Sequence, residues 1–156
     1  MVGRMSEPTP FTMDSLRHAA GADLGVSDWF EIGQDRITAF AEATDDRQWI
    51  HVDPQRAAEG PYGTTIAHGF LTLSLLPAVT RQLLRISDAG ARINYGLNRV
   101  RFPSPVPVGS RIRGRATIVS VDEVPGGLQV VLAVVVEREG SDKPVCIAES
   151  IMRALV

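Results

Sequence analysis

The feature that most constrains the fold is a change of hydrophobic pattern at Gly90. Before this glycine, residues 70–86 form the most apolar segment of the chain, and its first half is hydrophobic on nearly all sides. Such a pattern is typical of a helix surrounded by protein. Pro77 is expected to kink or interrupt this helix. After Gly90 apolar and polar residues alternate, which indicates strands.

Four strand-like runs follow the apolar helix, at residues 93–102, 112–124, 128–136 and 145–155. Gly126 and Gly127 separate the second run from the third and predict a hairpin turn. An earlier run at residues 27–32 is aromatic and β-branched, which predicts a fifth strand. The chain is therefore predicted to be an α+β domain, with a five-stranded, mainly antiparallel sheet wrapped around a central hydrophobic helix.

The amino-terminal part is expected to be irregular at first. Residues 1–11 contain two prolines and little apolar content, which predicts a flexible segment ahead of a single domain over residues 12–156. Thr12 or Ser15 is expected to cap a short helix that ends near residue 20.

A second helical region precedes the apolar segment. Residues 34–44 have apolar positions at helical spacing, so they predict an amphipathic helix that leads into a polar turn at residues 45–48. Asp53 is a favourable helix cap and Pro54 a favourable first helical residue, so a short helix is expected over about residues 54–59.

Length and composition limit the class of protein. A chain of 156 residues is long enough for one domain with its own core, and its formal charge of −2 gives no reason to expect nucleic acid or a membrane as partner. The single cysteine, Cys146, excludes an intramolecular disulfide, and three scattered histidines form no zinc motif, so no metal is expected. No apolar stretch is long enough to cross a bilayer, and a cytoplasmic location is expected.

The densest group of polar residues within apolar sequence lies at residues 44–51. Asp46 and His51 are five positions apart with a turn between them, so a carboxylate and an imidazole can converge on one small volume. The alternative is structural, with Asp46 as a cap and His51 in the core. Gly69 begins the apolar helix, and its amide would suit a developing oxyanion, although glycine is also placed where backbones pack closely.

Two other polar groups have more ordinary explanations. Arg111, Arg113 and Arg115 recur at period two and share one face of a strand. They could bind phosphate groups, but a solvated face is the commoner arrangement, so we expect them to matter little. In the strand before the proline-rich turn, Asn94 or Asn98 could reach a site, and exposed strand positions are the simpler explanation.

Residues 41–53 resemble the hydratase motif of a known family, the MaoC-like hydratases and dehydratases with a hotdog fold, in particular its NodN-like single-domain branch. The motif runs roughly Ala-x-x-Thr/Ser-Gly-Asp-x-Asn-Pro-Ile/Val-His-x-Asp, and Asp46 and His51 fall on its aspartate and histidine. His68, Gly69 and residues 101–109 are also similar to the family, so the resemblance spans about residues 29–156.

Three residues depart from the motif. Gln48 replaces the usual asparagine and Trp49 the usual proline, as expected of the NodN-like branch. Asp45 replaces the usual glycine and adds a second carboxylate beside Asp46. Two such carboxylates, if both are buried, would favour the protonated form of one of them.

The resemblance implies a hydro-lyase of fatty acid metabolism that adds water reversibly to trans-2-enoyl thioesters and forms the (R)-3-hydroxyacyl thioester. It implies that Asp46 and His51 hold and activate the water and that the Gly69 amide binds the thioester carbonyl; Asn98 and Tyr95 are further substrate-binding candidates. Coenzyme A or acyl carrier protein would enter as part of the substrate, so no cofactor is expected. A homodimer is expected, because the sheet would otherwise have an exposed edge.

Two alternative functions remain open. A thioesterase of the same fold would place a carboxylate or water at the thioester carbonyl rather than at Cβ, and the pairing of Asp46 with His51 favours hydration. A non-catalytic subunit that binds acyl thioesters would need a partner for the chemistry. Turnover of crotonyl-CoA by the purified chain alone would exclude that alternative.

Overall fold

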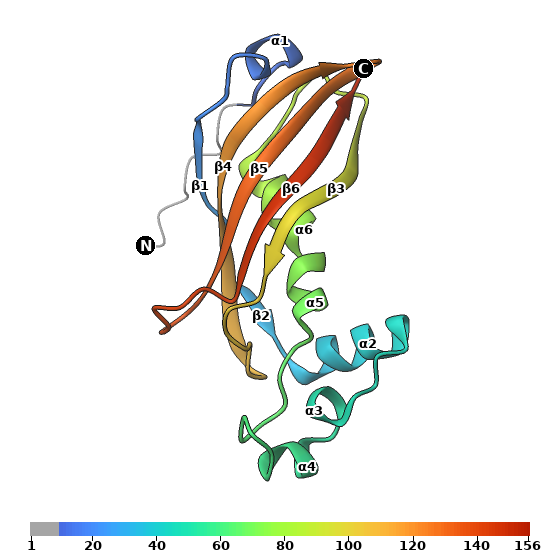
Figure 1. The fold of residues 1–156 in the computed structure, drawn as a ribbon, viewed down its shortest axis with the longest axis vertical. Helices are drawn as coiled ribbons and strands as arrows, with labels where there is room; N and C mark the ends of the chain where they lie inside the picture. The colour runs from blue at the N-terminus through green and yellow to red at the C-terminus, as the bar shows by residue number, and fades with distance from the viewer. Residues whose placement is uncertain (1–9) are drawn as a thin grey trace, which may run out of the picture.

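The computed structural model describes residues 10–156, which form a curved sheet around a central helical segment (Figure 1). In chain order the elements are α1 (Met13–Leu16), β1 (Asp23–Val26), β2 (Phe30–Ile32), α2 (Gln34–Thr44), α3 (Trp49–Val52), α4 (Pro54–Ala58), α5 (Gly69–Ser74), α6 (Leu76–Leu83), β3 (Ala91–Arg101), β4 (Ser110–Val124), β5 (Gly127–Arg138) and β6 (Cys146–Leu155). The strands are antiparallel in the order β1-β4-β5-β6-β3, with β2 also paired to β4. The predicted α+β architecture is confirmed.

Two short strands, β1 and β2, lie beside β4 at one edge of the sheet, and each pairs with a different part of β4. Ser27 interrupts them: its N–H donates to the Gly114 carbonyl at 2.8 Å, and its hydroxyl oxygen accepts the Gly114 N–H at 3.0 Å. The prediction of one strand over residues 27–32 was therefore wrong in its extent. Pairing with β4 extends strand structure back to Asp23, although Gly25 is a poor strand former.

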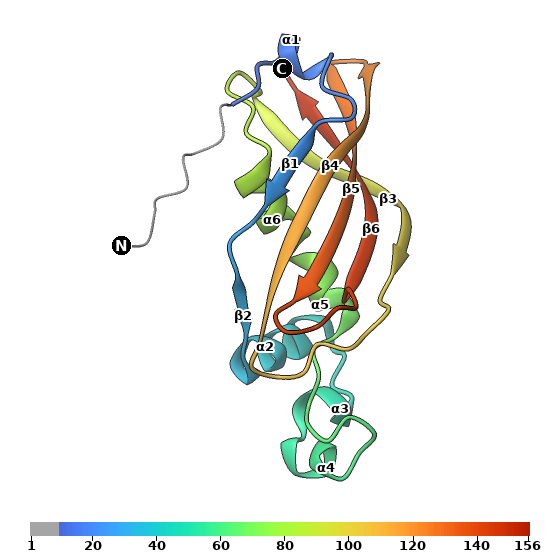
Figure 2. The same ribbon diagram turned by 90° about the vertical axis from the view of Figure 1, so that its left-hand side faces the viewer.

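The predicted apolar helix is a pair of short helices, α5 and α6, on the concave side of the sheet (Figures 1 and 2). They meet at Leu75, and Pro77 lies in the first turn of α6, where a backbone N–H has no acceptor within the helix and its absence costs no helical bond. The predicted interruption is confirmed, but α6 ends at Leu83 rather than at residue 86. Phe70, in the first turn of α5, is 65% exposed, so this end of the helix is not surrounded by protein.

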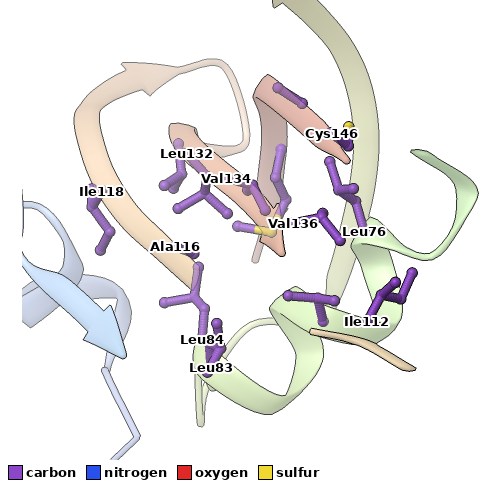
Figure 3. Packing of buried hydrophobic residues seen from close by; sticks show 14 of the residues in the cluster. Leu76, Leu83, Leu84, Ile112, Ala116, Ile118, Leu132, Val134, Val136 and Cys146 are labelled. Carbon is purple, nitrogen blue, oxygen red and sulfur yellow. The ribbon is translucent and has the colours of Figure 1, made fainter. Parts of the chain in front are cut away.

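The hydrophobic core lies between these helices and the concave face of the sheet (Figure 3). Alternate residues of β4, β5 and β6 point inward, as the period of a strand requires, and the buried ones include Ile112, Ala116, Ile118, Leu132, Val134, Val136 and Cys146. Burying a large apolar side chain contributes roughly 1.5–3 kcal/mol. Burial also raises the pKa of the Cys146 thiol to about 11, so this thiol stays protonated at neutral pH.

Helix α1 begins as predicted and ends early. Thr12 is its N-cap: the Thr12 hydroxyl accepts the Ser15 N–H at 3.1 Å, and the Ser15 hydroxyl accepts the Thr12 N–H at 2.9 Å. This reciprocal capping box satisfies two amides that the helix leaves unpaired. The helix ends at Leu16, short of the expected residue 20.

Phe11 already belongs to the folded domain. It forms a bridge with Ile86, and its carbonyl accepts the Ser87 N–H at 2.8 Å. The flexible segment expected over residues 1–11 therefore does not include Phe11, and residues 1–9 lie outside the described part of the chain. Within residues 10–156, no helix has the length and apolar character needed to cross a membrane.

Helix α2 lies at one end of the sheet, α3 and α4 lie beyond that end, and α1 lies at the opposite end (Figures 1 and 2). Helix α2 has the predicted bounds. Helix α4 begins as predicted at Pro54, with the Asp53 carboxylate accepting an amide of its first turn at 3.0 Å. Helix α3 was not predicted, because a single helical turn carries too little periodicity to be recognised.

Candidate active site

His51 is held in place from two sides. Its imidazole is buried, with 6% of the residue exposed, and Nδ1 lies 2.6 Å from the Ile66 carbonyl oxygen. A carbonyl only accepts hydrogen bonds, so Nδ1 carries the proton and donates it, and Nε2 keeps its lone pair. The backbone is fixed as well, because the Gln34 side chain on α2 donates to the His51 carbonyl at 2.8 Å. Gln34 in turn accepts the Thr65 hydroxyl at 2.6 Å, which ties α2 to the segment before α5.

The surroundings of His51 favour its neutral form. Burial lowers the pKa of His51 below its ordinary value of 6.5; the hydrogen bond to the Ile66 carbonyl opposes this, His68 lowers the pKa further, and the Asp46 carboxylate raises it. Because burial is the largest of these effects, the imidazole is neutral at pH 7. Its Nε2 lone pair is therefore available to accept a hydrogen bond.

Asp46 lies in the exposed turn between α2 and α3. The turn is set by Asp45, which ends α2 in the left-handed conformation at φ 61° and ψ 13°. The Asp45 carboxylate is exposed and paired with Arg47 at 2.7 Å, and Arg47 also holds Glu42 at 2.9 Å. Asp45 and Asp46 are both exposed, so the two carboxylates are not buried together.

His68 joins the predicted pair at the site. A carboxylate oxygen of Asp46 and one imidazole nitrogen each of His51 and His68 lie within 4.8 Å of one another. The His68 ring stacks on the His51 ring at a centroid separation of 3.7 Å and an interplanar angle of 23°. From the sequence, His68 was named only as one of the residues that are similar to the family, and its imidazole was given no role. That similarity, in one of the three histidines of the chain, was the available signal.

These three residues are also the group of side chains within residues 10–156 that could hold a metal ion. One nitrogen of each imidazole is already bonded to a carbonyl oxygen, that of Ile66 or that of Asp46. Two stacked imidazoles direct their remaining nitrogens along nearly parallel planes, whereas tetrahedral zinc needs ligands that converge. The arrangement therefore suits a bound water better than a metal ion.

Gly69 is the first residue of α5, so its amide has no intrahelical partner. A Cβ added at Gly69 would lie 2.8, 2.9 and 3.0 Å from three ring atoms of Phe102, which explains why glycine is needed. A cavity of about 330 Å³ borders Gly69 and Phe102. Both explanations offered for this glycine, an available amide and close packing, are therefore compatible with the structure.

Asn98 and Tyr95 lie on the edge strand β3. The Asn98 amide donates to the Glu149 carboxylate at 2.8 Å, and the Tyr95 ring lies 3.5 Å from the Arg153 guanidinium carbon. Among the described residues, none of these contacts reaches Asp46 or either histidine of the site. Tyr95 instead lines a larger cavity of about 570 Å³ between the helix pair and β3.

The arginine row lies on β4 and is largely engaged with neighbours. Arg111 pairs with Glu139 at 2.9 Å, Arg113 pairs with Glu137, and both guanidinium groups lie over the Trp29 ring. These are contacts on the outward face of the sheet. The location agrees with the expectation of a solvated, charged face.

Comparison with known proteins identifies the class. The chain is 55% identical over 139 residues to 3-hydroxyacyl-thioester dehydratase Z of Mycobacterium tuberculosis, covering 88% of this chain and 92% of that protein. It is 48% identical over 128 residues to nodulation protein N of Rhizobium leguminosarum bv. viciae, covering 80% and 79%. Its fold matches the unliganded R-hydratase PhaJ1 of Pseudomonas aeruginosa with a TM-score of 0.75 at 23% identity, covering 94% and 86%.

An antiparallel sheet wrapped around a helix, with a second helical segment beyond one end, makes this a hotdog-fold protein. The sequence pattern of the MaoC-like domain matches residues 15–139, and the chain belongs to that family.

Proposed function

We propose that this protein is an (R)-specific 2-enoyl-thioester hydratase, equivalently a 3-hydroxyacyl-thioester dehydratase. The observation that carries the proposal is the convergence of an exposed carboxylate and a neutral imidazole, from Asp46 and His51, beside His68. Gly69 follows His68 directly and begins α5, so its amide is the neighbouring unpaired donor. Two relatives, one 55% identical over 139 residues and one 35% identical over 88 residues, bear dehydratase names, which supports the same reaction class.

The spacing of the two groups suits a single water molecule. Two hydrogen bonds of about 2.8 Å to one water oxygen can span the separation of up to 4.8 Å between the Asp46 carboxylate oxygen and the His51 imidazole nitrogen. His51 Nε2 can only accept, so the water points one hydrogen at it. The second hydrogen is left for Asp46, which leaves a lone pair on the water oxygen free to attack.

Hydration then needs three events. The water oxygen bonds to Cβ of the enoyl thioester while Asp46 takes a water proton. Negative charge develops on the thioester oxygen, where the Gly69 amide donates a hydrogen bond. Asp46 then returns the proton that it took from the water to Cα, which completes the 3-hydroxyacyl product and restores the Asp46 carboxylate. A positioned acid/base group contributes roughly 10²–10⁴ in rate, and one oxyanion donor roughly 10²–10³.

The substrate is proposed to be a thioester of coenzyme A or of acyl carrier protein in cytoplasmic fatty acid metabolism. The cavity beside Gly69 has room for the thioester end. In the apolar helix pair, Leu71 packs in the core, Leu73 lines the larger cavity, and Leu76 does both. The apolar residues of the helix pair thus serve both the packing of the core and the lining of the cavity.

The test is turnover of crotonyl-CoA, followed by loss of absorbance of the conjugated thioester. Asp46→Asn and His51→Gln should each lower kcat by about 10² or more, because the first removes the group that takes the water proton and the second removes the imidazole that orients the water. The double variant should lose much less than the product of the two losses, since both groups act on one water. His18→Gln is the matched control, because His18 is exposed near α1 at the opposite end of the molecule.

Near-normal turnover by Asp46→Asn, with an unchanged circular dichroism spectrum, would refute the assignment. Hydrolysis to free thiol without hydration would favour a thioesterase. No turnover by the purified chain, with activity restored by a second protein, would favour an accessory subunit. A series of 2-enoyl-CoA chain lengths would then define the acyl group.

We also propose a homodimer formed through β3. This strand has 11 residues and is the edge strand beside β6, and its apolar side chains Ile93, Tyr95 and Leu97 are 46%, 54% and 45% exposed. A long apolar edge favours pairing with another strand, and a second copy presents the same edge about a two-fold axis. Sedimentation that shows only a 16.9 kDa species at micromolar concentration would exclude the dimer.

A further inference from the structure

His68 links the turn that carries Asp46 to the start of α5. Its Nε2 lies 2.9 Å from the Asp46 main-chain oxygen, and only 2% of the residue is exposed. Because a carbonyl cannot donate, Nε2 carries the proton and donates to Asp46. The other nitrogen, Nδ1, is then a buried acceptor without a hydrogen-bond partner.

The two histidines form a pair of hydrogen bonds, here called the histidine clasp, that joins residues 46–51 to residues 66–68. His51 reaches forward to the carbonyl of Ile66, two residues before His68, and His68 reaches back to the carbonyl of Asp46, five residues before His51. A backbone bond from Ile66 N–H to the Ile50 carbonyl at 3.0 Å runs between them. The histidine clasp therefore fixes both Asp46 and His51 to the same segment, residues 66–68.

The His68 ring is itself confined on two sides. It stacks on His51 at 3.7 Å, and the Phe40 ring from α2 lies at 4.9 Å with an interplanar angle of 56°. A donor held by two ring contacts loses little freedom when it bonds to Asp46. The side chain of Arg47, the next residue, bonds to Glu42 and Asp45 and so holds one part of the turn. The hydrogen bond from His68 holds the turn at Asp46 itself.

We propose that His68 is a positioning residue: its Nε2–H fixes the Asp46 main chain so that the carboxylate shares one water with His51. This inference rests on the proposed function. His68 does not need to touch the substrate. Its effect is geometric, because a displacement of about 1 Å in a reacting group can cost about 10² in rate.

Two substitutions separate the donor from the ring. His68→Phe keeps a flat ring against His51 and Phe40 and removes the N–H. His68→Gln keeps a side-chain N–H at about the place of Nε2 and removes the ring. The phenylalanine variant also removes the unpartnered Nδ1 acceptor, which offsets the lost hydrogen bond in the stability of the fold. Loss of activity without loss of folding is therefore expected.

Kinetics on crotonyl-CoA should show kcat of His68→Phe reduced about 10- to 100-fold with KM changed less than about threefold. His68→Gln should recover kcat to within about fivefold of the original protein. His18→Phe, the same change at an exposed site, should have no effect. Full activity of His68→Phe, or an equal loss in both His68 variants, would overturn the inference.

Amide hydrogen exchange gives a second measurement that does not depend on turnover. Exchange of residues 45–48 should be faster in His68→Phe than in the original protein and close to normal in His68→Gln, because exchange reports local opening. Equal exchange in all three proteins would overturn the positioning role. An original protein that fails to hydrate enoyl thioesters, yet shows this exchange pattern, would instead refute the proposed function alone.

Discussion

Replacing Gly69 with alanine tests whether a single close contact sets the geometry of the proposed oxyanion donor. The added methyl would lie 2.8–3.0 Å from three atoms of the Phe102 ring. Normal carbon–carbon contacts are about 3.5–4.0 Å, so the two groups must separate by about 0.5–1 Å. The Phe102 ring also packs edge-on against Phe70 at 6.0 Å between centroids, which limits where it can move.

The sign of the stability change follows from comparing two opposed effects. Alanine in place of glycine favours a helix by up to about 1 kcal/mol in its interior, and by less at the first residue. Overpacking costs about 1–3 kcal/mol. Phe102 is 40% exposed as a residue and its ring can move in part, so the net loss for Gly69→Ala should be about 1 kcal/mol. If α5 moves instead of the ring, the Gly69 amide shifts, and kcat should fall about 10- to 100-fold.

The assay is a double-variant cycle with Phe102→Ala, measured by urea unfolding and by crotonyl-CoA hydration. Removing the ring gives the Gly69→Ala methyl room, so the double variant should be more stable and more active than the sum of the single changes predicts. Additive effects on stability and on kcat would refute the argument, as would a Gly69→Ala protein with normal stability and normal turnover.

The remaining predictions use the same assays. Because burial lowers the pKa of His51 below 6.5, kcat/KM should fall only as pH drops below 6.5. In that range the unfolded chain binds a proton at His51 more readily than the folded chain does, so the free energy of unfolding should also fall. This fall should be smaller in His51→Gln. Replacing Arg111, Arg113 and Arg115 together by serine should raise KM for the substrate less than about tenfold, or 1.4 kcal/mol. Asp45→Gly should retain activity, measured as kcat, because glycine adopts the left-handed conformation freely.

The main layers of the fold could be predicted because burial is periodic along this chain. Alternate residues of β4 and β5 face one core, so the strands are visible as a period of two. The division between β1 and β2 could not be predicted, since it depends on hydrogen bonds between Ser27 and Gly114, 87 residues apart. The single turn α3 was missed because it is held by contacts with α2 and α4 rather than by its own pattern.

The predicted pair of site residues was close in sequence, and that is why a motif could locate it. His68 is distant from Asp46 in sequence by 22 positions, and its contribution depends on a hydrogen bond to a main-chain carbonyl, which any residue at position 46 would offer. Tyr95 and Asn98 were chosen from a strand whose inward and outward faces are shifted by two irregularities in the β3–β6 pairing. A simple alternation cannot show which of its side chains face a cavity.

At position 45 the backbone conformation and the side-chain charge of Asp45 have separate effects on the site. The family's usual glycine suggests a backbone need rather than a chemical one, and Asp45 does adopt a left-handed conformation at the end of α2. Aspartate tolerates this conformation better than most side chains. Its carboxylate turns to Arg47, which also holds Glu42, so the added charge is neutralised on the exposed side of the turn. Asp45 can therefore replace glycine while Asp46, held by His68, keeps its place beside His51.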